Sequence, residues 1–232
     1  MIHIIPSDDR PSVDLGWLQS HPSFSFGEYY DPENTGFSVM RVCNDDVLVG
    51  GRGFGPHPHS DMEIVTIVLN GAVRHEDNLG NTEVVSAGQV QRMSAGSGLI
   101  HAEYNASETE ELRLLQLWFM PAERGLTPSF ETCSYPQSGL KNSLLPVVAR
   151  DRKEGVAGIH QDMTVYLSRV GAGQAVDFRQ QEGRHIYVYA IEGNFALSGS
   201  RLTAGDTARI SGQHELKIEA EEDSFLMLID LP

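Results

Sequence analysis

The sequence predicts an all-β protein that is built from two related domains. Glycine (23 residues) and proline (11 residues) occur along the whole chain, and turn signals recur about every 8–12 residues. β-Branched and aromatic runs lie between these turns, and no long segment has a clean helical period. A weak internal repeat relates the two halves of the chain. These observations together favour sheets in two copies over any helical architecture.

The expected strands are short apolar runs bounded by turn residues. The segment 77–81 (DNLGN) is expected to be a hairpin loop in which glycine supplies a positive φ. One short helix is expected at 12–19 (SVDLGWLQ), with Ser12 as its N-cap. The expected strands are 36–43 (GFSVMRVC), 63–70 (EIVTIVLN), 82–86 (TEVVS), 112–119 (LRLLQLWF), 164–170 (TVYLSRV), 184–192 (RHIYVYAIE) and 223–230 (DSFLMLID).

The internal repeat predicts where the chain divides. The first copy is EIVTIVLNGAV (63–73) followed by SAGQ (86–89), and the second is HIYVYAIEGNF (185–195) followed by TAGD (203–206). Each copy has a strand, a glycine turn, a hairpin and an Ala-Gly turn that opens the next strand. We therefore expect an N-terminal domain at 1–121, a linker region at 122–146 and a C-terminal domain at 147–232.

Composition excludes several classes of protein. The formal net charge of −15 over 232 residues disfavours direct nucleic-acid binding, because a polyanion repels phosphate backbones. No apolar run approaches the ~20 residues of a membrane helix, and the N-terminus has no secretory signal pattern. The two cysteines, Cys43 and Cys133, lie far apart and indicate no disulfide framework. A cytoplasmic protein without a membrane partner is expected.

Two pairs of residues predict a metal site in the first half of the chain. His57 and His59 are two residues apart in GRGFGPHPHSDME (51–63), so on an extended strand both rings project from one face. His101 and Glu103 have the same spacing in GLIHAEYN (98–105). Three imidazoles and one carboxylate suit a divalent first-row metal such as Fe(II), and this ligand set leaves coordination positions open for substrate or O₂.

The carboxylate of this set has an alternative. Glu63 has the same strand parity as His57 and His59, so periodicity also allows it to reach the metal. The isolated histidines are expected to be packing or surface residues; they are His21, His160 and His214.

The spacing around these ligands resembles the conserved motifs of cupins. The pattern Gly51-x5-His57-x-His59-x3-Glu63-x7-Gly71 resembles the first cupin motif. The second motif is matched by a glycine-rich segment that ends in GxxHxxxN, at positions Gly88, Gly98, His101 and Asn105. The resemblance implies that each half of the chain is a cupin-type β-barrel, so that the protein is a bicupin.

Departures from the ordinary cupin pattern narrow the resemblance to one family. Gly96 stands where cupins usually have proline, and the first motif is one residue longer than usual before Gly71. These features resemble pirin and its bacterial relatives, as do HPH (57–59), HED (75–77), SAGxGxxHxE (94–103), GWLQSHPSFSFGEYYDP (16–32) and LQLWF (115–119). The matching motifs are dense over about residues 14–121. In the rest of the chain only the order of the expected strands and turns is similar.

The resemblance to pirins also chooses between the two carboxylates. In ordinary cupins the glutamate of the first motif is the fourth ligand, whereas in pirins the ligand glutamate lies two residues after the last histidine. This implies metal ligands His57, His59, His101 and Glu103, with Glu63 in a supporting role. Hydrogen-bond partners that orient the imidazoles are expected among Asp61, Glu63 and Asn105, and His75 is expected either to line the site or to pack.

The C-terminal half departs most from this pattern. Only His185 stands near the position of the paired histidines, before the Gly193 turn, and it has no partner two residues away. His214 and Glu215 are adjacent and would point to opposite faces of a strand. This half is expected to be a barrel without a metal site.

Bacterial pirins resemble quercetin 2,3-dioxygenases, which cleave the central ring of flavonols with O₂ and release carbon monoxide. The resemblance implies a flavonol-like small-molecule substrate, O₂ and one divalent metal ion. Fe(II) is favoured, and Zn, Mn, Cu, Co or Ni would also fit the ligands. Glu103 would act as the catalytic residue by accepting the proton of the 3-hydroxyl, with Asp61 or Glu63 as relay. The expected aromatic and apolar pocket residues are Phe24, Phe26, Phe54 and Met93.

A second function has support from the same family. Eukaryotic pirins, which this chain also resembles, act as nuclear cofactors. The alternative is therefore a non-catalytic metal- or redox-sensing regulatory protein. Because the chain has no basic surface for DNA, it would act through a protein partner.

Overall fold

The computed structural model describes all residues from 1 to 232, and nearly all of its regular structure is β-strand. The chain forms two compact units. The N-terminal unit consists of residues 11–135 and 150–161, and the C-terminal unit consists of residues 1–10, 136–149 and 162–232. Each unit therefore takes short segments from the other half of the sequence. The division into an N-terminal domain at 1–121, a linker at 122–146 and a C-terminal domain at 147–232 stays a proposal.

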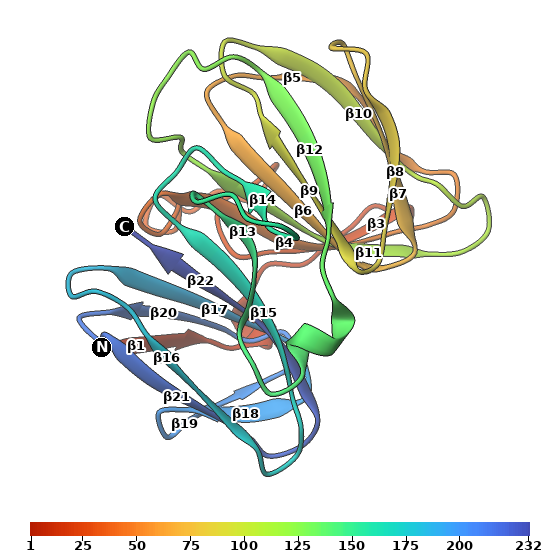
Figure 1. Ribbon diagram of the computed structural model, residues 1–232. Coiled ribbons are helices and arrows are strands. Elements are labelled where there is room, and N and C mark those ends of the chain that lie inside the picture. The colour runs from red at the N-terminus through yellow and green to blue at the C-terminus, as the bar shows by residue number, and fades with distance from the viewer. The chain divides into compact units, whose positions relative to one another are not determined.

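The N-terminal unit has two antiparallel sheets (Figure 1). The larger sheet has the order β12-β9-β6-β11-β4-β3-β2, and the smaller sheet has the order β5-β10-β7-β8. The segment 150–161 carries the short strand β14 (Ala157–Gly158). The other strands are β2 (Val13–Asp14), β3 (Leu18–Pro22), β4 (Met40–Leu48), β5 (Gly53–His59), β6 (Glu63–Asn70), β7 (Ala72–Asp77), β8 (Thr82–Ser86), β9 (Gln89–Ser94), β10 (Leu99–Asn105), β11 (Leu112–Phe119) and β12 (Ser129–Ser134).

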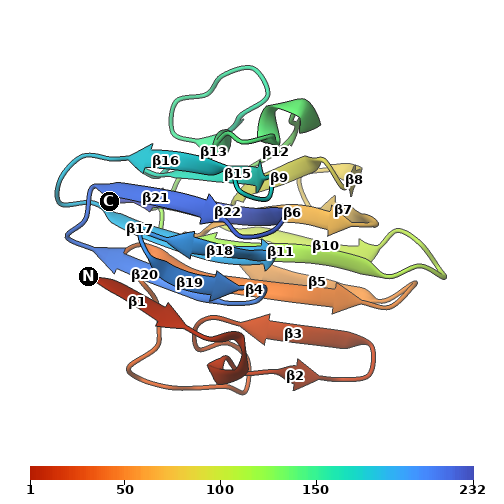
Figure 2. The same cartoon turned by 90° about the horizontal axis from the view of Figure 1, so that it is seen from below.

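The C-terminal unit repeats this design. Its larger sheet contains β1-β20-β17-β22-β15-β13, and its smaller sheet has the order β16-β21-β18-β19, which is visible in Figure 2. Two short 3-10 helices lie at Ser7–Asp9 (η1) and Gln137–Leu140 (η2). The strands are β1 (Ile2–Ile5), β13 (Leu145–Ala149), β15 (Thr164–Val170), β16 (Ala175–Arg179), β17 (His185–Glu192), β18 (Asn194–Leu197), β19 (Ser200–Thr203), β20 (Thr207–Ser211), β21 (Glu215–Ala220) and β22 (Ser224–Leu231).

The two units correspond strand by strand, which confirms the internal repeat. The order β9-β6-β11-β4 in one unit matches β20-β17-β22-β15 in the other, and β5-β10-β7-β8 matches β16-β21-β18-β19. The repeated turns have the same backbone, with φ of +77° at Gly71 and +76° at Gly193, and +90° at both Gly88 and Gly205. A side chain at Gly71 or Gly193 would also meet a backbone atom within 3.0 Å, so these turns require glycine.

The predicted strands are largely confirmed. The strands at 63–70, 82–86, 112–119 and 164–170 have the expected bounds, and the loop 77–81 connects β7 to β8. The expected strand at 36–43 is found at 40–48, because Phe37 and Met40 pair across a tight turn in which Ser38 has a φ of 50°. The strand therefore starts after this turn.

The helix expected at 12–19 is wrong. This segment is a hairpin between β2 and β3, with Gly16 at a φ of +78° in the turn. The carboxylate of Asp14 accepts a hydrogen bond from the Gly16 amide at 2.8 Å, and the Leu15 amide donates to the Leu18 carbonyl. A side chain that satisfies the backbone of a turn competes with helix formation, and glycine at positive φ completes the turn.

Each unit buries its own apolar core between its sheets. In the C-terminal unit the core includes all the inward positions of the small sheet, such as Val176, Phe178, Leu216 and Ile218. In the N-terminal unit the apolar core is divided into a larger cluster, which includes Val68, Val73, Val85, Leu112 and Leu114, and a smaller cluster of Ile64, Met93 and Leu99. That barrel also carries the polar residues described below. No helix in the structure is both long enough and apolar enough to cross a membrane.

Candidate metal centre

Three imidazoles converge where strands β5 and β10 pair. His57 lies directly opposite His101 in the antiparallel register, and His59 lies opposite Leu99. The ring centroids of His57, His59 and His101 are separated by 4.5–5.0 Å. The register shifts between His101 and Glu103, where β5 has one residue more than β10. Such a bulge re-aims side chains locally, and bulges are frequent beside functional sites.

The nitrogen atoms of these imidazoles are available for a metal ion. His57 Nδ1 lies 2.8 Å from the Gly55 carbonyl oxygen, so Nδ1 carries the proton and Nε2 keeps its lone pair. His59 Nε2 and both ring nitrogens of His101 are buried and have no hydrogen-bond partner. Burial and the neighbouring imidazole of His57 lower the pKa of His59 to about 4 and the pKa of His101 to about 3. The rings of His59 and His101 are therefore neutral at pH 7, as metal coordination requires.

The donor set fits a metal ion. One potential ligand atom of each of His57, His59 and His101 lies within 4.8 Å of the others. Burying neutral ring nitrogens without partners is costly, and a cation between the rings would satisfy one nitrogen of each imidazole. The cluster is compatible with a single divalent transition metal.

Glu103 is held next to this cluster by a row of polar side chains on the larger sheet. Its carboxylate joins a second group of potential ligands with His75 and His101, in which the ligand atoms also lie within 4.8 Å of one another. Gln116 Nε2 donates to Glu103 Oε2 at 2.9 Å, and Gln91 Nε2 donates to Glu103 Oε1. Thr66 Oγ1 donates to Glu103 Oε1 at 3.3 Å. The carboxylate therefore has a fixed orientation beside the imidazoles.

The row that holds Glu103 follows the strand register. Gln91 pairs with Thr66 between β9 and β6, and Thr66 pairs with Gln116 between β6 and β11. Complete burial raises the pKa of Glu103, and hydrogen bonds from Gln116 and Gln91 oppose that effect. Sequence reasoning missed this row. The sequence signal that could have revealed it is a polar residue at an inward position of a largely apolar strand, such as Gln116 in LRLLQLWF (112–119).

His75 supports the site from strand β7. It lies opposite Glu103, and Asp77 lies opposite His101. The His75 ring is fully buried, its Nε2 lies 3.1 Å from Asp77 Oδ2, and it stacks on Phe130 with centroids 4.1 Å apart. His75 therefore does both of the things expected of it as alternatives. Its ring packs on the aromatic ring of Phe130, and it also lies beside His101 of the imidazole cluster.

Glu63 belongs to a different contact network. Glu63 Oε2 accepts hydrogen bonds from Ser94 Oγ at 2.9 Å and from the His160 amide at 3.1 Å. His160 is carried by the segment 150–161, so Glu63 fastens this segment to strand β6. Glu63 is absent from both groups of potential metal ligands.

The other expected supporting residues lie in loop contacts. Asp61 Oδ1 accepts a hydrogen bond from the Gly125 amide at 2.7 Å. Asn105 donates to the carbonyl oxygens of Leu48 and Glu110. The Gly55 carbonyl orients the His57 ring, Asp77 orients the His75 ring, and the two glutamine amides orient Glu103.

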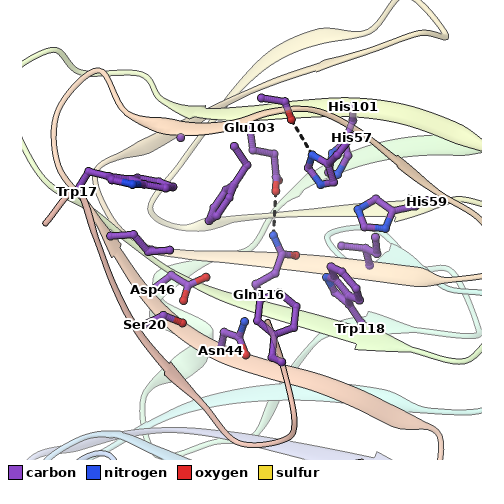
Figure 3. A pocket seen from close by; sticks show the side chains of 16 residues that line it. Trp17, Ser20, Asn44, Asp46, His57, His59, His101, Glu103, Gln116 and Trp118 are labelled. Carbon is purple, nitrogen blue, oxygen red and sulfur yellow. Dashed lines mark hydrogen bonds between the residues drawn. The ribbon is translucent and has the colours of Figure 1, made fainter. Parts of the chain in front are cut away.

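The cluster opens into a cavity of about 490 Å³ with mainly aromatic and aliphatic walls (Figure 3). Phe26 and Phe54 line it as expected, whereas Phe24 and Met93 do not. Trp17 packs edge-to-face on Phe54 at 5.6 Å, and Trp118 packs in the same way on Phe26 at 5.5 Å. Such a volume and lining are typical of sites for planar organic molecules. The lining residues are Trp17, Leu18, Ser20, Phe26, Asn44, Asp46, Gly53, Phe54, Gly55, His57, His59, Ile64, His101, Glu103, Gln116 and Trp118.

The C-terminal unit has apolar side chains at the corresponding place. Strands β16 and β21 correspond to β5 and β10, and their inward residues Val176, Phe178, Leu216 and Ile218 are part of the core. The expected position of His185 is wrong, because this residue lies on β17, the counterpart of β6. Its Nδ1 lies 3.0 Å from Ser211 Oγ.

Comparison with known proteins supplies the family. The family model named Pirin matches residues 6–119, and the model for the quercetinase C-terminal cupin domain matches residues 146–231. A protein of Escherichia coli strain K12 named quercetin 2,3-dioxygenase is 41% identical over 232 residues, which cover 100% of this chain and 99% of that protein. The chain belongs to the pirin family. The expected resemblance and the expected bicupin fold are both confirmed.

Other pirins match over the whole length. A pirin-like protein of Caulobacter vibrioides is 39% identical over 231 residues, with 99% of each chain covered. The crystal structure of the bacterial pirin YhhW from Escherichia coli in complex with nickel(II) has a TM-score of 0.94 and 40% identity, and the match covers 100% of this chain and 99% of that one. That pirin was therefore crystallised with a divalent transition metal.

Proposed function

We propose that this pirin is a metal-dependent dioxygenase that cleaves the central ring of flavonols such as quercetin with O₂ and releases carbon monoxide. His57, His59, His101 and Glu103 would hold one divalent ion, with Fe(II) favoured and Zn, Mn, Cu, Co or Ni as alternatives. The observation that carries the proposal is that partnerless imidazole nitrogens converge at an aromatic cavity of about 490 Å³. The names of its whole-length relatives support the same reaction.

The residues around the metal centre have distinct roles in this proposal. A bound metal ion would supply Lewis acidity and a template for the substrate. The aromatic walls formed by Trp17, Phe54 and Trp118 would hold a planar flavonol and exclude water. Glu103 would accept the proton of the 3-hydroxyl, because a buried carboxylate with a raised pKa is a stronger base than an exposed one. Gln91 and Gln116 would keep that carboxylate in position.

The partners of the reaction follow from the same proposal. They are a flavonol-like small molecule and O₂. The net charge of −15 disfavours nucleic acid as a partner. A cytoplasmic location is part of the proposal and is supported by Cys43 and Cys133, which do not form a disulfide.

Turnover tests the proposal directly. The protein loaded with one equivalent of Fe(II), Mn(II), Co(II), Ni(II) or Cu(II) should consume O₂ with quercetin and release carbon monoxide. A flavone that lacks the 3-hydroxyl should not react. His59→Ala should abolish turnover, whereas His185→Ala and His214→Ala should keep the rate within about a factor of two, which is under ~0.5 kcal/mol. Carbon monoxide no higher than in the free-metal control would refute the enzyme and leave the metal-sensing regulatory role.

A further inference from the structure

The cavity has a second polar wall, which the metal-centred reaction does not use. Ser20, Asn44 and Asp46 line the cavity and are 5%, 1% and 3% exposed. Asn44 Oδ1 and Asp46 Oδ1 have no hydrogen-bond partner. An acceptor buried without a partner costs free energy, and such groups are rare in folded proteins unless a ligand or water satisfies them.

The strand register shows that this wall is built into the fold. Ser20 on β3 lies opposite Asp46 on β4, and Asn44 on β4 lies opposite Gln116 on β11. Gln116 in turn donates to Glu103. One continuous set of inward polar side chains therefore leads from the carboxylate beside the imidazoles to the wall formed by Ser20, Asn44 and Asp46.

The two polar walls lie on opposite sides of the cavity. Figure 3 shows Ser20, Asn44 and Asp46 grouped on one side and the three imidazoles on the other. Apolar walls connect them, with the edge-to-face pair of Trp17 and Phe54 among their members. A planar molecule lying between the aromatic rings would have one end near the imidazoles and another part near Asp46.

We propose that Ser20, Asn44 and Asp46 form a distal subsite that selects ligands with a hydrogen-bond donor, such as a phenolic hydroxyl, remote from the metal-chelating oxygen. This inference rests on the proposed function, because it assumes a flavonol-like ligand with one end at the imidazoles. The orphaned atoms are acceptors, so they require a donor from the ligand. A ligand with a carboxylate at that end would be disfavoured, since Asn44 Oδ1 is an acceptor and no Lys or Arg side chain is among the lining residues to pair with the carboxylate.

Two flavonols that differ in the distal donors provide the test. Quercetin carries hydroxyl groups on both outer rings, whereas 3-hydroxyflavone has the chelating group alone. Binding would be measured with Ni(II)-loaded protein without O₂, by quenching of tryptophan fluorescence. Wild-type protein should bind quercetin at least tenfold more tightly, which corresponds to about 1.4 kcal/mol. Asp46→Leu should weaken quercetin binding about tenfold and change 3-hydroxyflavone binding less than about twofold.

Further variants separate the subsite from a general loss of structure. Asp46→Asn keeps the side-chain volume and one acceptor, so quercetin binding should fall by an intermediate factor of about three. Ser20→Ala should act in the same direction. Asp45→Asn is the matched control, because Asp45 is the adjacent aspartate on β4, is absent from the cavity lining and pairs with Arg113 at 2.7 Å. It should bind both flavonols as the wild type does.

The outcomes distinguish this inference from the proposed function. If quercetin is preferred and Asp46→Leu removes the preference, the distal subsite is supported even when carbon monoxide is never released. If carbon monoxide is released but both flavonols bind equally, or if Asp46→Leu and Asp45→Asn behave alike, water satisfies the buried acceptors and the subsite is refuted alone. If neither flavonol binds the Ni(II)-loaded protein, both ideas are refuted.

Discussion

The fold opposes the ionisation of Asp46. Burial raises its pKa from 3.8 to about 7, against the lowering effect of the Ser20 hydroxyl. The carboxyl group therefore keeps its proton in the folded protein over a pH range in which it has lost that proton in the unfolded chain. Ionisable groups with a perturbed pKa cluster at functional sites, which agrees with a role of Asp46 in ligand selection.

The raised pKa of Asp46 predicts a pH-dependent gain in stability for the metal-free Asp46→Asn variant. Between pH 3.8 and about 7 the folded wild type binds more protons than the unfolded chain, so its stability falls as pH rises. The slope is at most about 1.4 kcal/mol per pH unit. The variant lacks this titration, so its unfolding free energy relative to wild type should rise by about 3 kcal/mol between pH 4.5 and 7.5. Urea denaturation at both pH values measures this, and a constant difference would contradict it.

At the scale of strands, the alternation of side chains along a strand predicted which residues share a face. It did not predict which strands pair with each other. The spacing of His57 and His59, and of His101 and Glu103, was enough to predict that each pair projects together. The pairing of β5 with β10, which brings His57 opposite His101, depends on long-range register and has no local signal. Parity also left Glu63 open, and the structure shows it fastening residues 150–161, a contact across 97 positions of sequence.

The polar row on the larger sheet was missed for a related reason. Thr66 and Gln116 lie within largely apolar strands and Gln91 lies in a mixed one, and nothing in the local sequence shows that the three side chains meet. They become a unit only when β9, β6 and β11 are aligned. The same applies to Asn44 and Asp46, and to the helix wrongly expected at 12–19, where a turn of Asp14 and Gly16 overrides the apolar spacing.

The strand positions of Glu103 and Glu63 predict different effects for the same substitution. Glu103→Gln should weaken Fe(II) binding roughly 10–100-fold, because it removes the carboxylate beside His101. Glu63→Gln should leave Fe(II) affinity within about threefold and lower the unfolding free energy by about 1–3 kcal/mol, since buried hydrogen bonds from Ser94 and His160 are disturbed. Anaerobic titration and urea denaturation measure both quantities.

The matched pair also tests the choice of ligand. Hydrogen exchange over residues 150–161 should increase in Glu63→Gln and remain unchanged in Glu103→Gln. Equal losses of Fe(II) affinity, or a larger loss in Glu63→Gln, would show that this pirin uses the ordinary cupin arrangement.

For the whole molecule, the same arrangement of strands encloses an apolar core in one unit and a cavity in the other. The strand orders of the two units correspond, yet β5 and β10 carry histidines and a glutamate where β16 and β21 carry Val176, Phe178, Leu216 and Ile218. Filling the barrel with apolar side chains produces a continuous core, whereas opening it at one end produces a cavity beside a cluster of potential metal ligands. The N-terminal unit keeps one apolar cluster around Leu112 and Leu114 and a smaller one of Ile64, Met93 and Leu99, and neither cluster includes an imidazole.

This separation of core and site predicts that the fold survives loss of the metal. Removing the metal with a chelator, or with the double substitution His57→Ala and His101→Ala, should leave the far-ultraviolet circular dichroism unchanged, because neither apolar core includes an imidazole. Metal present at 100 times its Kd should stabilise the wild type by about 2.7 kcal/mol through mass action. The melting temperature of the wild type should therefore fall by about 5–10 °C with chelator, while that of the double variant should not respond. Cooperative unfolding on chelation would show instead that the metal is structural, as in zinc fingers, and would remove most of the support for an enzyme.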